Sequence, residues 1–163
     1  VQNQSQSSAQ SQSAQKNTSN NSEISISDFV KKYDFFIPVD FLNSDFQICT
    51  LHDLMHSDEK VYDTGPKSQQ ILKELVNTCE NVFWNGPLGM FEDERCKSTK
   101  DFIQFLDENK IDIFVGGGET VMAVRKYSER IERFKISTGG GSLLTLMSGG
   151  SMPGLEICEM KYA

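Results

Sequence analysis

Glycine, a carboxylate and a hydroxyl occur side by side at residues 116–120, in the order Gly-Gly-Gly-Glu-Thr. The preceding segment, Ile111 to Val115, alternates apolar residues as a short buried strand does, and a helical pattern begins at Glu119 and Thr120. A strand that ends in glycines and opens a helix is a common anion site, because the backbone approaches closely and the first N–H groups of the helix are unpaired. Standing alone, the triplet fits a tight strand–helix turn equally well.

Two further segments repeat this arrangement. In residues 134–147 a short strand is followed by Gly139, Gly140 and Gly141 and then by a helical run. In residues 82–92 a strand is followed by a turn rich in Gly and Pro. Loops that follow the strands of an open parallel sheet lie at its carboxyl edge, where such sheets bind ligands. We therefore expect the three loops to converge on one ligand site.

Strands and helices that alternate along the chain must position these loops. We expect strands at 33–42, 46–51, 82–85, 111–115 and 134–137. We expect helices from Pro66 onward and at 98–109, 119–129 and 142–148, with Ser98 and Asp101 as a capping box and an amphipathic end after Pro153. This alternation predicts an α/β fold, a three-layer, Rossmann-like sandwich with about four parallel strands and one or two short extra strands.

Composition divides the chain into two parts. Residues 1–22 are almost entirely Gln, Ser and Asn, and such a segment is expected to be a disordered tail because it has nothing to bury. The tail is either inert or a self-associating tract, and we favour the inert interpretation. Residues 23–163 are enough for one domain. Because the chain begins with Val, we expect a processed or incomplete product.

Charge and cysteine usage restrict the function classes. The net charge of −7 argues against nonspecific nucleic-acid binding. The four cysteines show no CxxC spacing and predict free thiols in a reducing compartment, and Cys49, His52 and His56 do not make a recognised metal site. No apolar run approaches the ~20 residues of a membrane span, and no signal peptide is apparent, so we expect a cytoplasmic location without membrane contact.

Common phosphate-binding signatures are absent, since neither GxGxxG with a following acid nor GxxxxGK[ST] occurs. Six other motifs occur in order: IPVDF (37–41), DTGP (63–66), WNGPLGMFE (84–92), VGGGET (115–120), STGGG (137–141) and MPG (152–154). With these motifs, from about Phe35 to Gly154, the sequence resembles the later part of the C-terminal, nucleotide-binding domain of phosphoglycerate kinase. The resemblance implies that residues 23–163 are a truncated form of that α/β domain.

The resemblance also implies an activity and its site. The reaction would be reversible phosphoryl transfer between 1,3-bisphosphoglycerate and ADP in glycolysis, with ATP/ADP and Mg²⁺ as cofactors, in a usually monomeric protein. The residues matching the family's adenosine contacts are Asn85, Pro87, Leu88 and Glu92. The residues matching its phosphate loop are Gly117, Gly118, Glu119 and Thr120, with Glu119 as the metal contact. Gly140 and Gly141 match the loop near the transferred phosphoryl group.

Departures from the family qualify these implications. The family usually has Asp at the position of Glu119, a small Gly at the position of Val61, and Ala-Ser-Leu-Glu where this chain has 142–145. The family's basic N-terminal domain and its GGAKV-type segment are missing, so phosphoglycerate would bind only if that domain is present. We therefore expect this chain alone to be inactive. The alternative is a degenerate nucleotide-binding or interaction module without catalysis.

Overall fold

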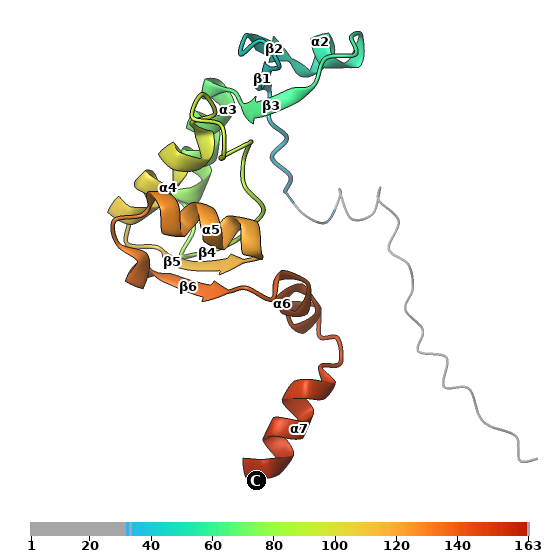
Figure 1. Ribbon diagram of the computed structural model, residues 1–163, viewed down its shortest axis with the longest axis vertical. Helices are drawn as coiled ribbons and strands as arrows, with labels where there is room; N and C mark the ends of the chain where they lie inside the picture. The colour runs from blue at the N-terminus through green and yellow to red at the C-terminus, as the bar shows by residue number, and fades with distance from the viewer. Residues whose placement is uncertain (1–31, 33, 163) are drawn as a thin grey trace, which may run out of the picture. The chain divides into compact units, whose positions relative to one another are not determined.

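The computed structural model describes Lys32 and residues 34–162, so the predicted tail at 1–22 lies outside the described residues (Figure 1). Contacts divide the chain into two units, Val1–Phe35 and Phe36–Ala163, and every element below belongs to the second. Its strands are β1 (Asp40–Asn43), β2 (Ile48–Thr50), β3 (Val61–Thr64), β4 (Asn81–Asn85), β5 (Asp112–Gly116) and β6 (Phe134–Ser137). Its helices are α2 (Leu51–Met55), α3 (Pro66–Val76), α4 (Ser98–Glu108), α5 (Gly118–Tyr127), the 3₁₀ turn Ile131–Arg133, α6 (Gly140–Met147) and α7 (Pro153–Tyr162).

Two three-stranded sheets confirm the α/β fold class. One is parallel, in the order β4-β5-β6, and the other is a small antiparallel sheet in the order β2-β1-β3. The expected strand at 33–42 is wrong in its extent, because residues 34–39 form no strand and β1 begins at Asp40. Pro38 has no N–H to donate to a ladder, which agrees with the late start. This strand joins the antiparallel sheet, so the parallel sheet has three strands within the described residues and not about four.

The core lies between one face of the parallel sheet and the helices that cover it. In register across the three strands, Trp84, Val115 and Ile136 share this face. Ile113 and Val115 are fully buried beneath Ile103 and Leu106 of α4 and Val124 of α5, all in one apolar cluster. Figure 1 shows α4 and α5 along this side of the sheet. The alternation of strand residues thus fixes which face the helices cover.

The N-terminus of α3 is capped from a distance. Its N-cap, Gly65, offers no side chain, and a Cβ there would collide with Asp40. The carboxylate of Asp40 on β1 instead accepts from Lys67 N (3.0 Å), Ser68 N (2.7 Å) and Ser68 Oγ (2.6 Å). Burial raises the pKa of Asp40, but these hydrogen bonds outweigh it and lower the pKa below its ordinary value of 3.8.

A second buried carboxylate corrects the expected capping box at α4. The N-cap of α4 is Lys97, without a side-chain cap, and not Ser98. The Ser98 hydroxyl and N–H both donate to Asp63 of β3, which is 1% exposed and also accepts from Thr64 N at 2.9 Å. Ser98, which the sequence predicted to be a local cap, therefore links α4 to β3, and β3 itself was not predicted.

The C-terminal helices are poorly buried. No residue of α6 is buried, and Leu155 and Ile157 of α7 are exposed, so neither of these two apolar side chains of the expected amphipathic end is covered. In the described part of the chain, no helix has the length and apolar character needed to cross a membrane.

Candidate functional site

The loops after β4, β5 and β6 meet at two glycines, as expected. Gly117 adopts φ 88°, which favours glycine, and a Cβ there would lie 2.7 Å from Asn85 Oδ1. A Cβ on Gly140 would lie 2.8 Å from the Gly117 Cα. Gly117 N also donates to Ser137 O at 3.1 Å, where β6 ends. Side chains larger than hydrogen are thus excluded where the three loops join.

Two helices start at this junction. The first intrahelical bond of α5 runs from Val121 N to Gly117 O (3.0 Å), and that of α6 runs from Leu143 N to Gly139 O (2.8 Å). The N–H groups of 118–120 and 140–142 therefore precede the hydrogen-bonded turns. A Cβ on Gly118 or Gly141 would meet nothing within 4 Å, so the space beside both helix starts is open. Two helix N-termini side by side are suited to an anion such as a phosphate.

Thr120 fixes the first loop. It is 1% exposed, and its Oγ1 accepts from Gly86 N at 2.8 Å. Gly86 has φ 105°, and its carbonyl accepts from Trp84 Nε1 at 2.6 Å. The Trp84 ring packs edge-on against Phe102 in the core. The hydroxyl of Thr120 therefore positions the backbone of the β4 loop from the first turn of α5.

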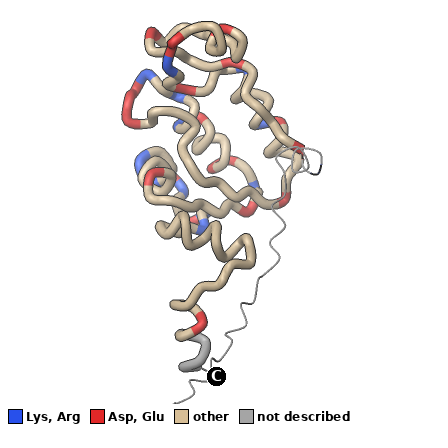
Figure 2. The backbone as a smooth tube through the Cα atoms, turned by 90° about the vertical axis from the view of Figure 1, so that its right-hand side faces the viewer, with Lys and Arg blue, Asp and Glu red and all other residues tan. Residues whose placement is uncertain are grey.

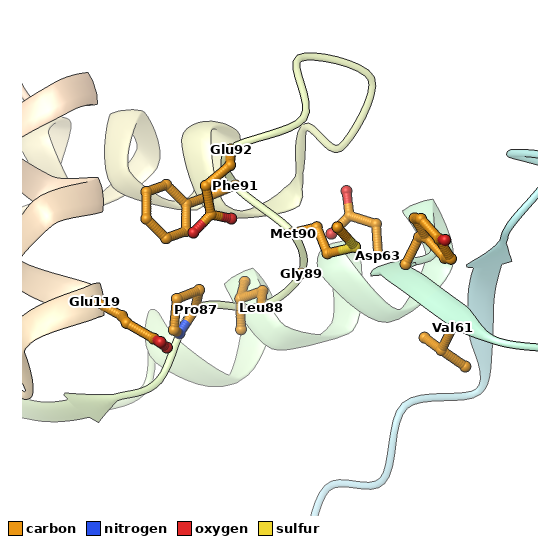
Figure 3. Close-up of a pocket in the computed structure, with 10 residues that line it drawn as sticks. Val61, Asp63, Pro87, Leu88, Gly89, Met90, Phe91, Glu92 and Glu119 are labelled. Carbon is orange, nitrogen blue, oxygen red and sulfur yellow. The ribbon is translucent and has the colours of Figure 1, made fainter.

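A cleft of about 450 Å³ lies beside the β4 loop (Figure 3). Glu119 extends into it from α5, and Glu92 lies on the loop side. With the buried Asp63, three carboxylates and no Lys or Arg stand among its ten lining residues. A phosphate ligand bound here would need backbone amides and a cation. The lining residues are Val61, Tyr62, Asp63, Pro87, Leu88, Gly89, Met90, Phe91, Glu92 and Glu119.

Partly buried hydrogen bonds hold the floor of the cleft. Leu88 N donates to Thr99 Oγ1 of α4 (3.0 Å), and Leu88 O accepts from Thr64 Oγ1 of β3 (2.7 Å). Met90 N donates to Tyr62 O at 2.9 Å. Residues 88–90 are thus fixed between β3 and α4 on both sides. Gly89 is required there, because a Cβ would collide with Asp63.

Arg95, three residues after Glu92 of the cleft, already has partners on the protein. Arg95 pairs with Asp93 at 2.6 Å, and its guanidinium lies 3.9 Å from the centre of the Phe46 ring. The side-chain hydrogen bond from Arg95 lowers the pKa of Asp93 to about 2. Burial raises the pKa of the neighbouring Cys96 thiol, and Asp63 adds to this effect. These groups stabilise the loop and leave the two glutamates as the cleft's exposed charges.

The structure brings the predicted site residues together in two adjoining places. Pro87, Leu88, Glu92 and Glu119 line the cleft. Asn85, Gly117, Gly118, Thr120, Gly140 and Gly141 form the glycine junction and the two helix starts. Sequence reasoning missed Tyr62, Asp63, Gly89, Met90 and Phe91 in the cleft. For Gly89, Met90 and Phe91 the available signal was their place in the WNGPLGMFE motif, where close backbone approach favours glycine at 89.

Comparison with known proteins now identifies the family. A model of the phosphoglycerate kinase family, described as "Phosphoglycerate kinase", matches residues 3–150. The chain belongs to the phosphoglycerate kinase family. It is 35% identical over 106 residues to the phosphoglycerate kinase of Francisella tularensis and 35% identical over 105 residues to that of Francisella philomiragia. Each alignment covers 64% of this chain and 27% of the relative.

Solved phosphoglycerate kinase structures agree with this assignment. The Coxiella burnetii protein superposes with a TM-score of 0.69 at 26% identity, over 80% of this chain and 36% of that protein. The Pyrococcus horikoshii protein superposes with a TM-score of 0.62 at 25% identity, over 77% of this chain and 32% of that protein. This chain therefore spans about a quarter to a third of the length of these relatives.

Proposed function

We propose that this chain forms the part of a phosphoglycerate kinase that binds ADP or ATP with Mg²⁺. The observation that carries the proposal is the junction of Asn85, Gly117 and Gly140, where a Cβ on either glycine would collide with its neighbour. Such a junction leaves room for a ligand to approach the backbone at the starts of α5 and α6. The starts of α5 and α6 at this junction suit the phosphates of a nucleotide.

The residues have distinct roles in this proposal. The N–H groups at 118–120 and 140–142 would bind phosphate oxygens, with Gly140 and Gly141 beside the phosphoryl group in transfer. Glu119 would hold the Mg²⁺, which usually binds one or two carboxylates together with substrate phosphates. The cation would also offset repulsion between the phosphates and the two glutamates of the cleft.

The cleft would bind the adenosine. Its apolar side chains, Val61, Leu88 and Met90, would contact the base, and Glu92 would accept hydrogen bonds from the ribose. Asn85 and Pro87 begin the same loop. Because Leu88 is held by Thr64 and Thr99, this wall is organised before the ligand arrives.

The whole reaction would be phosphoryl transfer between 1,3-bisphosphoglycerate and ADP, giving 3-phosphoglycerate and ATP. Positioning and electrostatic stabilisation carry most of the rate of such transfers. We propose that the chain alone does not catalyse it, since it matches about a third of a solved relative. A nucleotide-binding module without catalysis is the second candidate, favoured by the same partial match.

Family membership and the free thiols Cys49, Cys79 and Cys96 favour the cytoplasm.

Calorimetric titration of the purified chain with MgADP tests nucleotide binding. We expect saturable binding, weakened about tenfold or more in Glu119→Ala, because a carboxylate–metal contact is lost. Glu132→Ala is the matched control, since Glu132 is exposed in the 3₁₀ turn outside the cleft and should leave affinity unchanged. Absence of binding at millimolar MgADP would refute the proposal, and normal turnover in a coupled ATP-formation assay would refute the expected inactivity.

A further inference from the structure

A second cavity, of about 490 Å³, is lined by α4, by the end of α5 and by the loop that precedes α4. Lys97, Lys100 and Lys126 line it, whereas no Lys or Arg lines the cleft that contains Glu92 and Glu119. The net charge of the chain is −7, and basic and acidic residues are mixed along the backbone (Figure 2). Three lysines around one cavity therefore do not reflect a generally basic surface.

The face of α4 that borders this cavity is polar. Lys97, Lys100, Asp101 and Gln104 all line the cavity, and their spacing of i, i+3, i+4 and i+7 places them on one face of a helix. Leu106 lies on the opposite face and is fully buried in the core. The helix thus presents charged and amide groups to the cavity and apolar side chains to the sheet.

Opposite charges share this cavity without pairing. Glu94 and Asp101 line it together with the three lysines, but none of the ion pairs that the described residues form includes any of these five side chains. Lys126 donates to the Phe91 carbonyl at 3.4 Å, which is long for a hydrogen bond, and its Nζ lies 4.8 Å from the centre of the Tyr127 ring. The charged groups of the cavity are therefore available to a ligand.

The wall behind these groups is fixed to the protein. Tyr127 Oη donates to Phe91 O at 2.8 Å, and Cys96, which is 4% exposed, donates through Sγ to Tyr62 O at 3.5 Å. Phe91 and Tyr62 line the cleft, so the two cavities are tied to one another through this wall, although they share no lining residue. A wall held by such bonds is organised before a ligand arrives.

We propose that this cavity binds a phosphate monoester that also carries hydroxyl groups, such as a sugar phosphate. The ammonium groups of Lys97, Lys100 and Lys126 pair with the phosphate, since charge-assisted hydrogen bonds to phosphate oxygens are strong. Glu94 and Asp101 accept hydrogen bonds from the hydroxyl groups, whereas they would repel a bare phosphate. The volume of the cavity is typical of small-molecule sites. The proposal does not depend on nucleotide binding in the cleft.

Calorimetric titration of the full 163-residue chain with glucose 6-phosphate, inorganic phosphate and glucose tests the proposal. We expect saturable binding of glucose 6-phosphate, binding of inorganic phosphate that is weaker by about threefold or more, and no binding of glucose at millimolar concentration. The double variant Lys100→Gln and Lys126→Gln should weaken binding of glucose 6-phosphate about tenfold or more, because two charged contacts with the phosphate are lost. The double variant Lys60→Gln and Lys110→Gln is the matched control, because both lysines are exposed and lie outside the cavity.

Glu94→Ala tests the hydroxyl contacts separately. It should weaken binding of glucose 6-phosphate about threefold or more, because an acceptor for a hydroxyl group is lost, and it should not weaken binding of inorganic phosphate. Circular dichroism checks that the variants keep the fold, since Glu94, Lys100 and Lys126 are exposed.

Backbone amide shifts in nuclear magnetic resonance spectra locate the bound glucose 6-phosphate. We expect them at residues 94–104 and 126–127. Shifts confined to 117–120 and 140–142 would place the phosphate at the glycine junction, which would overturn this proposal and leave the nucleotide site intact. Binding that survives the double lysine variant, equal affinities for glucose 6-phosphate and inorganic phosphate, or no binding at millimolar glucose 6-phosphate would each overturn it as well.

Discussion

Gly140 lies so close to Gly117 that a Cβ on Gly140 would come within 2.8 Å of the Gly117 Cα. The obstructing atom is backbone, so it cannot move aside as a flexible side chain would. The two glycines open α6 and α5, respectively, and their contact sets the distance between the two helix N-termini. Any residue but glycine at 140 must therefore displace one helix start from the other.

Gly140→Ala should weaken MgADP binding about tenfold or more, because misplacement of a site by ~1 Å carries penalties of up to about 10²-fold in the chemistry that depends on it. Calorimetric titration measures the effect. Gly154→Ala in α7 is the matched control, since its Cβ would meet nothing within 4 Å. Equal affinities for the two variants would show that the junction does not position the ligand.

Asp40→Asn should lower the free energy of unfolding by about 1–3 kcal/mol at pH 7, because the buried carboxylate accepts from Lys67 and Ser68. The pKa of Asp40 is lowered in the folded state. The carboxylate therefore contributes fully to the free energy of unfolding above the unfolded-state pKa of 3.8, and this contribution is lost as pH falls through the lower folded-state pKa. The difference between variant and parent should thus shrink from pH 7 to pH 3.

Denaturant unfolding at both pH values measures this difference. Asp45→Asn serves as the control, because Asp45 is exposed, and it should match the parent at both. A destabilisation by Asp40→Asn that stays the same at pH 3 and pH 7 would mean that the carboxylate is not the stabilising species.

The buried carboxylates of Asp40 and Asp63 also show why parts of the fold could not be predicted from the sequence. β5, β6 and their glycine loops were predictable, since apolar alternation followed by glycine is a local pattern. The cap of α3 comes from Asp40, 28 residues before Ser68, and the anchor of α4 comes from Asp63, 35 residues before Ser98. Such pairings have no local periodicity. The sequence VYDT of β3 does not alternate cleanly, and its partner is β1.

The residues of the candidate site also fall into some that the sequence could predict and some that it could not. Glu119, Leu88 and the glycines could be predicted from motifs and from the family resemblance. Tyr62 and Asp63 could not, because they enter the cleft only through the pairing of β3 with β1 and through the contact of Gly89 with Asp63. The sequence also could not predict that the sheet face carrying Phe114, which is 38% exposed, is uncovered in the described part of the chain, because an apolar strand residue does not show which element packs against it.

Ser98→Ala should destabilise the chain by about 1–3 kcal/mol, because it removes a hydroxyl donor from Asp63, which is 1% exposed. Ser57→Ala should stay within about 0.5 kcal/mol of the parent, since Ser57 is exposed. Urea unfolding followed by the fluorescence of Trp84 gives both values. If Ser98→Ala unfolds at the same urea concentration as Ser57→Ala, the tie between α4 and β3 contributes nothing to stability.

The described thiols should react in a fixed order. Burial raises the pKa of Cys49 and of Cys96, with further increases from Glu59 and Asp63, respectively, whereas Cys79 is exposed. Because the thiolate is the reactive species and must also be reached, N-ethylmaleimide at pH 7.5 should label Cys79 at least about tenfold faster than the other two. Peptide mass spectrometry over time measures the three rates. In 8 M urea the rates should converge, and equal rates in the folded chain would contradict the burial of Cys96 between Tyr62 and the loop that forms the cleft.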